Sequence, residues 1–155
     1  MRIRQPYVHP WEYWNSNKKD YTLNYQVVAS LGKPFRIISF DGPFKGSAAD
    51  VSVFRDTLVP RLRPNEKVMT DKGYHLETER CWFPPVGHIN ALSVEEKIRR
   101  RKVTRIRHLN ERVVGRLKFW RFFKRRWHYS YAYNELCAHV IARLTNLELI
   151  VHPLT

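Results

Sequence analysis

Residues 21–40 read YTLNYQVVASLGKPFRIISF, and this stretch decides the fold. From Tyr21 to Ser30, large apolar side chains recur at every second position, which is typical of a β-strand with one buried face. Residues 31–34 have the composition of a turn, and residues 35–40 form a second short apolar run. The sequence therefore predicts two strands that pair back on one another as a hairpin.

Loop, helix and strand patterns alternate after this hairpin. Residues 41–47 (DGPFKGS) are rich in turn formers, and residues 48–62 carry apolar side chains at helical spacing. Residues 67–70 form a short apolar run that fits a buried strand and is followed at once by Asp71. Residues 73–92 contain two adjacent prolines and are expected to form a long loop.

Two helices are predicted in the C-terminal part of the chain. Residues 93–96 (SVEE) have the pattern of a capping box and open a helical stretch over residues 93–126. Residues 131–150 predict a last helix. The order strand, strand, helix, strand, helix, helix indicates a mixed α/β fold, and a length of 155 residues fits a single domain. The apolar stripe of the long helix is formed by Ile106, Leu109, Val113, Leu117 and Trp120.

The chain is strongly basic, with 28 Lys and Arg against 14 Asp and Glu and a net charge of +14. Such an excess favours a polyanionic partner, and nucleic acid before a membrane surface. Half of the Lys and Arg fall within residues 97–126, where Glu111 is the only acid. A solvated helix face is the alternative, but such faces usually mix both signs. The residues expected to contact phosphate from this helix are Arg100, Arg112, Arg116 and Lys124.

Composition also bears on the compartment. No run of about 18 apolar residues is present, so no membrane span or membrane partner is expected. Two cysteines are too few for a disulfide scaffold and suit a reducing compartment. The short basic runs at residues 99–102 (RRRK) and 124–126 (KRR) resemble nuclear-import signals, which gives the nucleus as the expected location.

Glu111 is unusual in its basic surroundings. At 100° per residue, it projects on the side of the helix opposite the apolar stripe. Arg107 lies one turn earlier, so one interpretation of Glu111 is an ion pair with that arginine, worth a few tenths of a kcal/mol.

Three motifs of the chain resemble those of Harbinger-type DDE transposases. Gly46-Ser-Ala-Ala-Asp50-Val-Ser-Val-Phe54 resembles their G-S-x-x-D-x-x-x-F segment, and Asp71-Lys-Gly-Tyr74 resembles their D-x-G-Y segment. Residues 111–118 (ERVVGRLK) resemble their E-R-x-x-G-x-L-K helix. The spacing of Arg107, Glu111 and Lys118 also matches part of a signature of related bacterial insertion-sequence transposases, although Thr104 stands where that signature has Tyr.

The resemblance implies a ribonuclease-H-like mixed sheet flanked by helices, and hydrolysis and strand transfer at DNA phosphodiesters with two divalent metals. In that family Asp71 would be the second catalytic acid and Glu111 the third, with Asp50 as a further metal ligand. Carboxylates suit this chemistry because Mg²⁺ and Mn²⁺ prefer hard oxygen ligands. Arg107 and Lys118 would contact phosphate.

Two acids at predicted element ends have other interpretations. Asp50 lies near the start of the helix predicted over residues 48–62, where a carboxylate can cap free N–H groups. Asp41 ends the second predicted strand and is expected to be a turn residue rather than a catalytic acid.

The family's first acid belongs to a D-G-T motif on a central first strand that would precede Met1. We therefore expect residues 1–155 to be an N-terminally truncated endonuclease domain with its first strand cut short, inactive or weakly active. The alternatives are a domesticated, non-catalytic DNA-binding protein and a basic structural or RNA-binding protein. The resemblance further implies a separate Myb-like targeting partner, and no small-molecule organic cofactor is expected.

Overall fold

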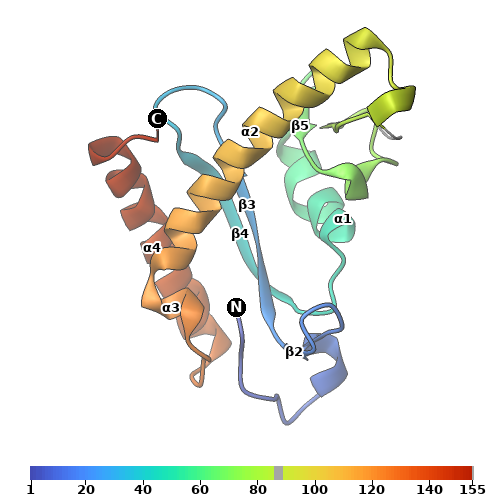
Figure 1. The fold of residues 1–155 in the computed structure, drawn as a ribbon. Coiled ribbons are helices and arrows are strands. Elements are labelled where there is room, and N and C mark those ends of the chain that lie inside the picture. Colours follow the sequence, from blue (N-terminus) through green and yellow to red (C-terminus); the bar gives the residue numbers. More distant parts are fainter. Residues whose placement is uncertain (86–88, 155) are drawn as a thin grey trace.

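The computed structural model describes residues 1–85 and 89–154 and has a mixed α/β architecture, as predicted (Figure 1). Helix α2 runs diagonally across the strands, with α4 on one side and α1 and β5 on the other (Figure 1). The strands are β1 (Trp14–Asn15), β2 (Asp20–Tyr21), β3 (Leu23–Ala29), β4 (Ile37–Lys45), β5 (Val68–Met69) and β6 (Cys81–Trp82). The α-helices are α1 (Asp50–Val53), α2 (Val94–Phe119), α3 (Arg121–Lys124) and α4 (Tyr131–Val151). Short 3₁₀ or π-helical turns are η1 (Pro10–Tyr13), η2 (Phe54–Leu58), η3 (Val59–Arg61), η4 (Lys72–Tyr74) and η5 (Ile89–Ala91).

The predicted hairpin is present as β3 and β4, which pair antiparallel from Leu23 opposite Lys45 to Ala29 opposite Ile37. The loop predicted over residues 41–47 is wrong for its first five residues, because β4 continues through them. Their turn formers fit a strand because a register shift absorbs an extra residue there. Gly42 has a φ of 128°, which glycine adopts without strain.

One face of β3 packs against the C-terminal helices. Val27 and Ala29 contact the main core cluster, and the hydroxyl of Tyr25 donates a hydrogen bond to Asn134 of α4. Full burial of a Leu, Val or Phe side chain stabilises the fold by roughly 1.5–3 kcal/mol, so this cluster supplies much of the driving force. Its buried members are Phe35, Ile37, Val113, Leu117, Ala142, Leu149 and Leu154.

The other face of β3 packs against the helix that follows the hairpin. Val28 contacts a second, smaller cluster formed by the buried residues Phe54, Leu58 and Cys81. Gln26 accepts a hydrogen bond from the hydroxyl of Thr57 at 3.0 Å. The hairpin is therefore covered on two sides, as α/β folds require.

The helix predicted over residues 48–62 spans residues 50–61 as three joined pieces, α1, η2 and η3. Pro60 lies in the closing 3₁₀ turn, consistent with its inability to continue an α-helix. The N-cap residue is Ala49 and no side chain caps this end, so the capping role considered for Asp50 is wrong.

Strand β5 is shorter than the predicted strand over residues 67–70 and is half-buried. It pairs in parallel with β6, which lies inside the loop predicted over residues 73–92, so that prediction is wrong at residues 81–82. A strand of two residues is too short to show the alternation of apolar and polar residues by which strands are predicted. Residues 86–88 of the predicted loop lie outside the described residues.

Helix α2 begins with the predicted capping box, in which Ser93 and Glu96 bond each other's backbone N–H groups at 3.2 and 2.8 Å. It ends at Phe119 and not at residue 126, because Trp120 adopts an extended backbone with ψ of 131° before α3 begins. The indole N–H of Trp120 donates to the buried hydroxyl of Thr145 in α4 at 3.0 Å. The break is thus associated with a contact to a distant helix.

Helix α4 matches the predicted range within one residue, but it packs through small and polar side chains. Large apolar residues of this helix, Val140, Leu144 and Leu147, are exposed by 40–59%. The buried residues are Asn134, Ala138, Ala142, Thr145 and Leu149.

Within the described residues, the strands form three separate two-stranded sheets, β1–β2, β3–β4 and β5–β6. None of the described helices combines the length and the apolar character that a membrane crossing requires.

Candidate functional site

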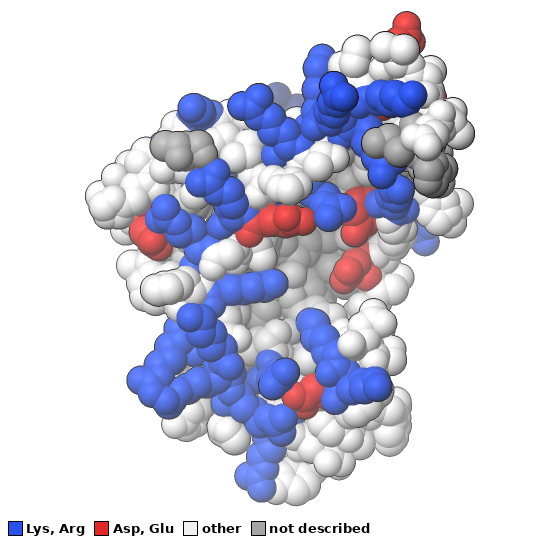
Figure 2. Space-filling model, in the orientation of Figure 1, with Lys and Arg blue, Asp and Glu red and all other residues white. Residues whose placement is uncertain are grey.

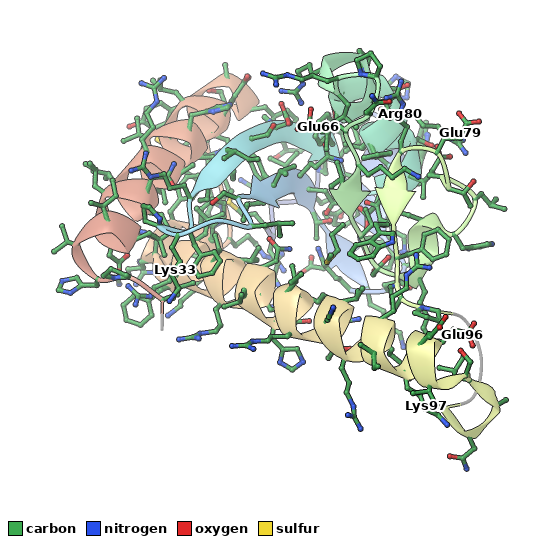
Figure 3. The ribbon with its side chains drawn as sticks, turned by 90° about the horizontal axis from the view of Figure 1, so that it is seen from above. Lys33, Glu66, Glu79, Arg80, Glu96 and Lys97 are labelled. Atoms are coloured by element: carbon green, nitrogen blue, oxygen red, sulfur yellow. The ribbon has the colours of Figure 1, made fainter. Side chains whose placement is uncertain are left out.

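A cavity of about 870 Å³ lies between β3 and β5. Residues 26–31 line it on the hairpin side, and residues 66–71 line it on the β5 side. Seen from above, the β3–β4 and β5–β6 pairs lie next to each other and α2 passes along both (Figure 3). The three acids predicted as metal ligands, Asp50, Asp71 and Glu111, all line this cavity.

Asp71 follows β5 and caps the short turn η4. Its Oδ1 accepts a hydrogen bond from the backbone N–H of Gly73 at 2.8 Å. A Cβ on residue 73 would lie 3.0 Å from that oxygen, so glycine gives the carboxylate room to close the turn. The Asp-Lys-Gly pattern therefore has a local structural reason as well as a candidate catalytic one.

Asp50 is the first residue of α1 and is exposed. Its side chain makes no hydrogen bond or ion pair with another residue in the described part of the chain. Its carboxylate is thus available to a ligand of the cavity.

Tyr74 lies close to both aspartates. Partial burial raises the pKa of its hydroxyl most, and the negative charges of Asp50 and Asp71 raise that pKa further. The ring packs edge-on against Phe54 with centroids 5.5 Å apart. The charges of two carboxylates that are 21 positions apart in the sequence therefore both act on the hydroxyl of this tyrosine.

Glu111 lies on α2 with 55% of its side chain exposed. Arg107 Nε lies 3.2 Å from Glu111 Oε1, which confirms the ion pair expected from their spacing. Because both side chains are about half exposed, the pair contributes only about 0.3–0.5 kcal/mol. A cation or a substrate phosphate could separate it at little cost.

The three carboxylates line the same cavity, but they do not form a complete set of metal ligands. Among the residues that the structure describes, no group of three or more His, Cys, Asp or Glu side chains is placed to hold one ion. The donor chemistry fits a hard divalent cation, since all three candidates offer carboxylate oxygens. The spacing in this conformation does not complete such a site.

Asp41 lies within β4 and not in a turn, contrary to the prediction. Its Oδ2 accepts hydrogen bonds from Arg61 Nη2 and from the Ser39 hydroxyl, each at 2.6 Å. Burial alone would raise the pKa of this carboxyl, but these hydrogen bonds and the Arg61 charge lower it below its usual value. Asp41 thus links β4 to the end of η3 through its ion pair with Arg61, which we call the Asp41–Arg61 tie.

Gly46, which opens the first motif, has a structural role. A Cβ on this residue would lie 2.7 Å from the carbonyl oxygen of Thr22, closer than side chains approach backbone atoms. Its own carbonyl oxygen accepts hydrogen bonds from Asn15 and Asn24. The glycine therefore lets the end of β4 pass against the N-terminal segment.

Basic side chains surround a central hollow on the face shown in Figure 2, with a few acidic side chains at its rim. Of the six residues predicted to contact phosphate, only Arg107 lines the same cavity as Glu111. Arg100 and Arg112 line a second cavity of about 830 Å³ beside α2. Its other basic lining residues include Lys33, Lys97, Arg101 and Arg105.

The three remaining basic candidates have different surroundings. Arg116 forms an ion pair with Glu148 of α4 at 2.8 Å. Lys124 Nζ lies 4.5 Å from the ring centroid of Phe119. Lys118 lies about two turns after Glu111 and so on nearly the same face of α2.

Polar residues beside the predicted acids also line the cavity, and the sequence assigned them no role. Tyr74 and Asn110 line it next to Asp71 and Glu111. Tyr74 ends the D-x-G-Y segment and Asn110 directly precedes Glu111, but a neighbour of an acid has no spacing of its own that would assign it a function.

The chain was compared with families of known proteins, with curated proteins and with solved structures. Residues 1–146 match the family model described as DDE superfamily endonuclease. No curated protein and no solved structure matches the chain.

Proposed function

Because the chain belongs to the DDE superfamily endonuclease family, we propose that it is a transposase-derived nuclease domain of Harbinger type that acts on DNA phosphodiester bonds. The family match covers all three motifs. One observation carries the assignment of the site: Asp50, Asp71 and Glu111 come from three separate elements and line a single cavity.

The cofactor in this proposal is Mg²⁺ or Mn²⁺, with Asp50, Asp71 and Glu111 as ligands. Such ions supply Lewis-acid activation of the phosphoryl group when bound. Arg107 and Lys118 lie on nearly the same face of α2 as Glu111, where charge-assisted hydrogen bonds can hold a DNA phosphate beside the carboxylates. A ribonuclease-H-like arrangement of the strands belongs to the same proposal.

We expect this chain to be inactive or weakly active by itself. Asp71 is engaged by the Gly73 N–H and Glu111 by Arg107. Each of these partners occupies one carboxylate oxygen and competes with a cation for it.

A non-catalytic DNA-binding protein is the second candidate. It is favoured by the basic lining of the second cavity, which includes Arg100 and Arg112 but none of the three carboxylates. Under either proposal the protein acts in the nucleus, as the import-like basic runs suggest. A Myb-like protein that directs it to its target is proposed on the family resemblance alone.

A plasmid-nicking assay tests the nuclease proposal. We expect weak nicking with Mn²⁺ or Mg²⁺ that is lost with a chelator and in Asp71→Asn and Glu111→Gln. The matched control is Glu79→Gln, because Glu79 is exposed and does not line the cavity. Nicking that survives both site variants would contradict the assignment.

DNA affinity separates the two candidates. Phosphate contacts predict an affinity that falls steeply with salt and a shallower salt slope in Arg100→Ala with Arg112→Ala. Metal-independent binding without nicking would favour the non-catalytic protein, and a flat salt response would count against both.

A further inference from the structure

Helix α4 carries an apolar stripe on the side that faces away from the core, and Figure 1 shows this helix at the left edge of the molecule. At 100° per residue, the centre of the stripe lies about 170° from the centre of the buried side of the helix. The stripe is thus not part of the contact that holds α4 to the fold. Its members, each 40–69% exposed, are Tyr133, Leu136, Val140, Leu144, Leu147, Ile150 and Val151.

The stripe follows a seven-residue repeat. Its central residues form two series in which members are seven positions apart, and the two series alternate at intervals of four and three residues. This is the 3.5-residue period of a coiled coil, in which the seam stays in contact with a second helix along its whole length. The a series is Cys137, Leu144 and Val151, and the d series is Tyr133, Val140 and Leu147.

The charges that flank this seam are complementary between two parallel copies of the helix. Arg143 takes a g position, and Glu148 takes the e position five residues later. At this spacing, g and e side chains of two parallel helices meet and set the orientation of the pair. An antiparallel pair would oppose g positions, which are Leu136, Arg143 and Ile150 and include no acid.

Both flanking side chains can reach a partner. Arg143 is exposed and forms no ion pair in the described part of the chain. Oε1 of Glu148 accepts a hydrogen bond from Arg116 at 2.8 Å, and no donor among the described residues contacts its Oε2. Glu148 can therefore bind Arg116 of its own chain and the guanidinium of a second copy together.

The size and charge of the stripe suit a weak dimer. Its side chains offer on the order of 600 Å² of apolar surface per copy, against roughly 800 Å² per partner in a standard interface. Helix α4 has one Arg against two Glu in a chain of net charge +14, so two copies would meet where their repulsion is small. A dissociation constant in the micromolar range follows, and chains at the dilution of an unfolding experiment are monomers.

We propose that the chain forms a two-fold symmetric dimer through α4. The two helices pair in parallel as a coiled coil of three heptads, and Arg143 of each copy pairs with Glu148 of the other. The occupant of the stripe is therefore a second copy of the chain. The dimer requires neither metal nor DNA, so this proposal goes beyond the nuclease proposal and does not depend on it.

Sedimentation equilibrium of the 155-residue chain tests the dimer, at high salt so that nucleic acid cannot bridge two copies. We expect a monomer–dimer equilibrium with a dissociation constant of about 1–100 μM. Leu144→Glu places carboxylates in the seam and should raise this constant roughly hundredfold or more. The matched control is Leu76→Glu, because Leu76 is an exposed leucine outside α4, and it should leave the constant unaltered.

Cys137 reports the orientation of the two helices. As an a residue it lies opposite its own copy only in a parallel pair, so mild oxidation with diamide should link two chains by a disulfide. Cys137→Ser should abolish the link. Cys81→Ser should not, because Cys81 is buried and cannot reach a second chain.

The flanking charges have a smaller effect. Arg143→Glu opposes two acids and should weaken the dimer roughly tenfold at low salt and less at high salt. Arg101→Glu changes the net charge equally but lies on α2, and it should have little effect. Equal weakening by both variants would contradict the Arg143–Glu148 pairing.

A chain that stays monomeric up to about 1 mM would overturn the proposal. So would a dimer that persists in Leu144→Glu, because another surface would then hold it, and a dimer that diamide does not link through Cys137. Loss of nicking in Asp71→Asn, with dimer formation intact, would separate this proposal from the nuclease proposal.

Discussion

The two sides of the central cavity differ in how they are held together. On one side, β3 and β4 are strands of seven and nine residues that share a core cluster with α2 and α4. On the other, β5 and β6 have two residues each and rest on the smaller cluster of Phe54, Leu58 and Cys81. We call these the hairpin side and the β5 side.

The candidate acids are divided between elements of these two sides. Asp50 and Asp71 belong to the β5 side, and Glu111 belongs to α2, which packs on the hairpin side. The hydrogen bonds Gln26–Thr57 and Asp41–Arg61 connect the two sides. The distance between the carboxylates therefore depends on how the smaller side rests on the larger one.

The largest expected effect lies in the core of the hairpin side. Leu149→Ala should lower the free energy of unfolding by about 2–5 kcal/mol, because this fully buried side chain would leave a cavity in the main core cluster. Denaturant unfolding measures the change. Leu147→Ala on the same helix is the control and should cost less than about 0.5 kcal/mol. Equal losses would show that α4 does not pack through its small-residue face.

A smaller loss is expected where α4 holds the start of β4. The side chain of Asn146 accepts from the N–H of Ile37 at 2.7 Å and donates to its C=O at 2.9 Å. Asn146→Ala should cost about 1–3 kcal/mol, because both backbone groups lose their partner. Asn146→Asp keeps the acceptor oxygen but loses the donor, so its free energy of unfolding should lie between those of the unmodified chain and Asn146→Ala. If Asn146→Ala lowers the free energy of unfolding by no more than Leu147→Ala does, water must take over the hydrogen bonds that the Asn146 amide makes to Ile37.

On the β5 side, the effect should be local. Asp71→Ala removes the acceptor for the Gly73 N–H, and loss of a cap costs about 1 kcal/mol. We expect faster amide exchange at Gly73 and unchanged exchange in β3 and β4. Asp71→Asn keeps an acceptor oxygen and should restore protection. Faster exchange in the hairpin would show that the two sides open together.

The smallest effect concerns the Asp41–Arg61 tie. The folded-state pKa of Asp41 is lowered, so its stabilisation is present above the usual value of 3.8 and is lost as pH falls through the lower folded value. Asp41→Asn should therefore cost about 0.2–1 kcal/mol at neutral pH and nothing in strong acid. Unfolding curves at several pH values measure this difference. A pH-independent difference would indicate that packing, not charge, makes the tie.

Local features were read correctly where neighbouring residues decide them. The Ser93–Glu96 capping box, the range of α4 and the hairpin all depend on short-range hydrogen bonds or on residue periodicity. The pairing of Glu111 with Arg107 likewise follows from helical geometry alone.

Other features depend on partners that are distant in sequence. Trp120 interrupts the long helix where it bonds to Thr145, and β6 exists because β5 offers it a parallel partner. Asp41 lies in a strand because β3 pairs with the residues around it. No local pattern encodes these contacts.

The sequence by itself determined the basic character of the chain, the order of its main elements and the three motifs that contain Asp50, Asp71 and Glu111. The tertiary structure decided that these acids line one cavity and that most of the predicted phosphate-binding residues do not. It also decided that β3 and β5 lie on opposite sides of that cavity. The reason is physical: periodicity and capping act over a few residues, whereas a cavity exists only where separate elements pack and leave space between them.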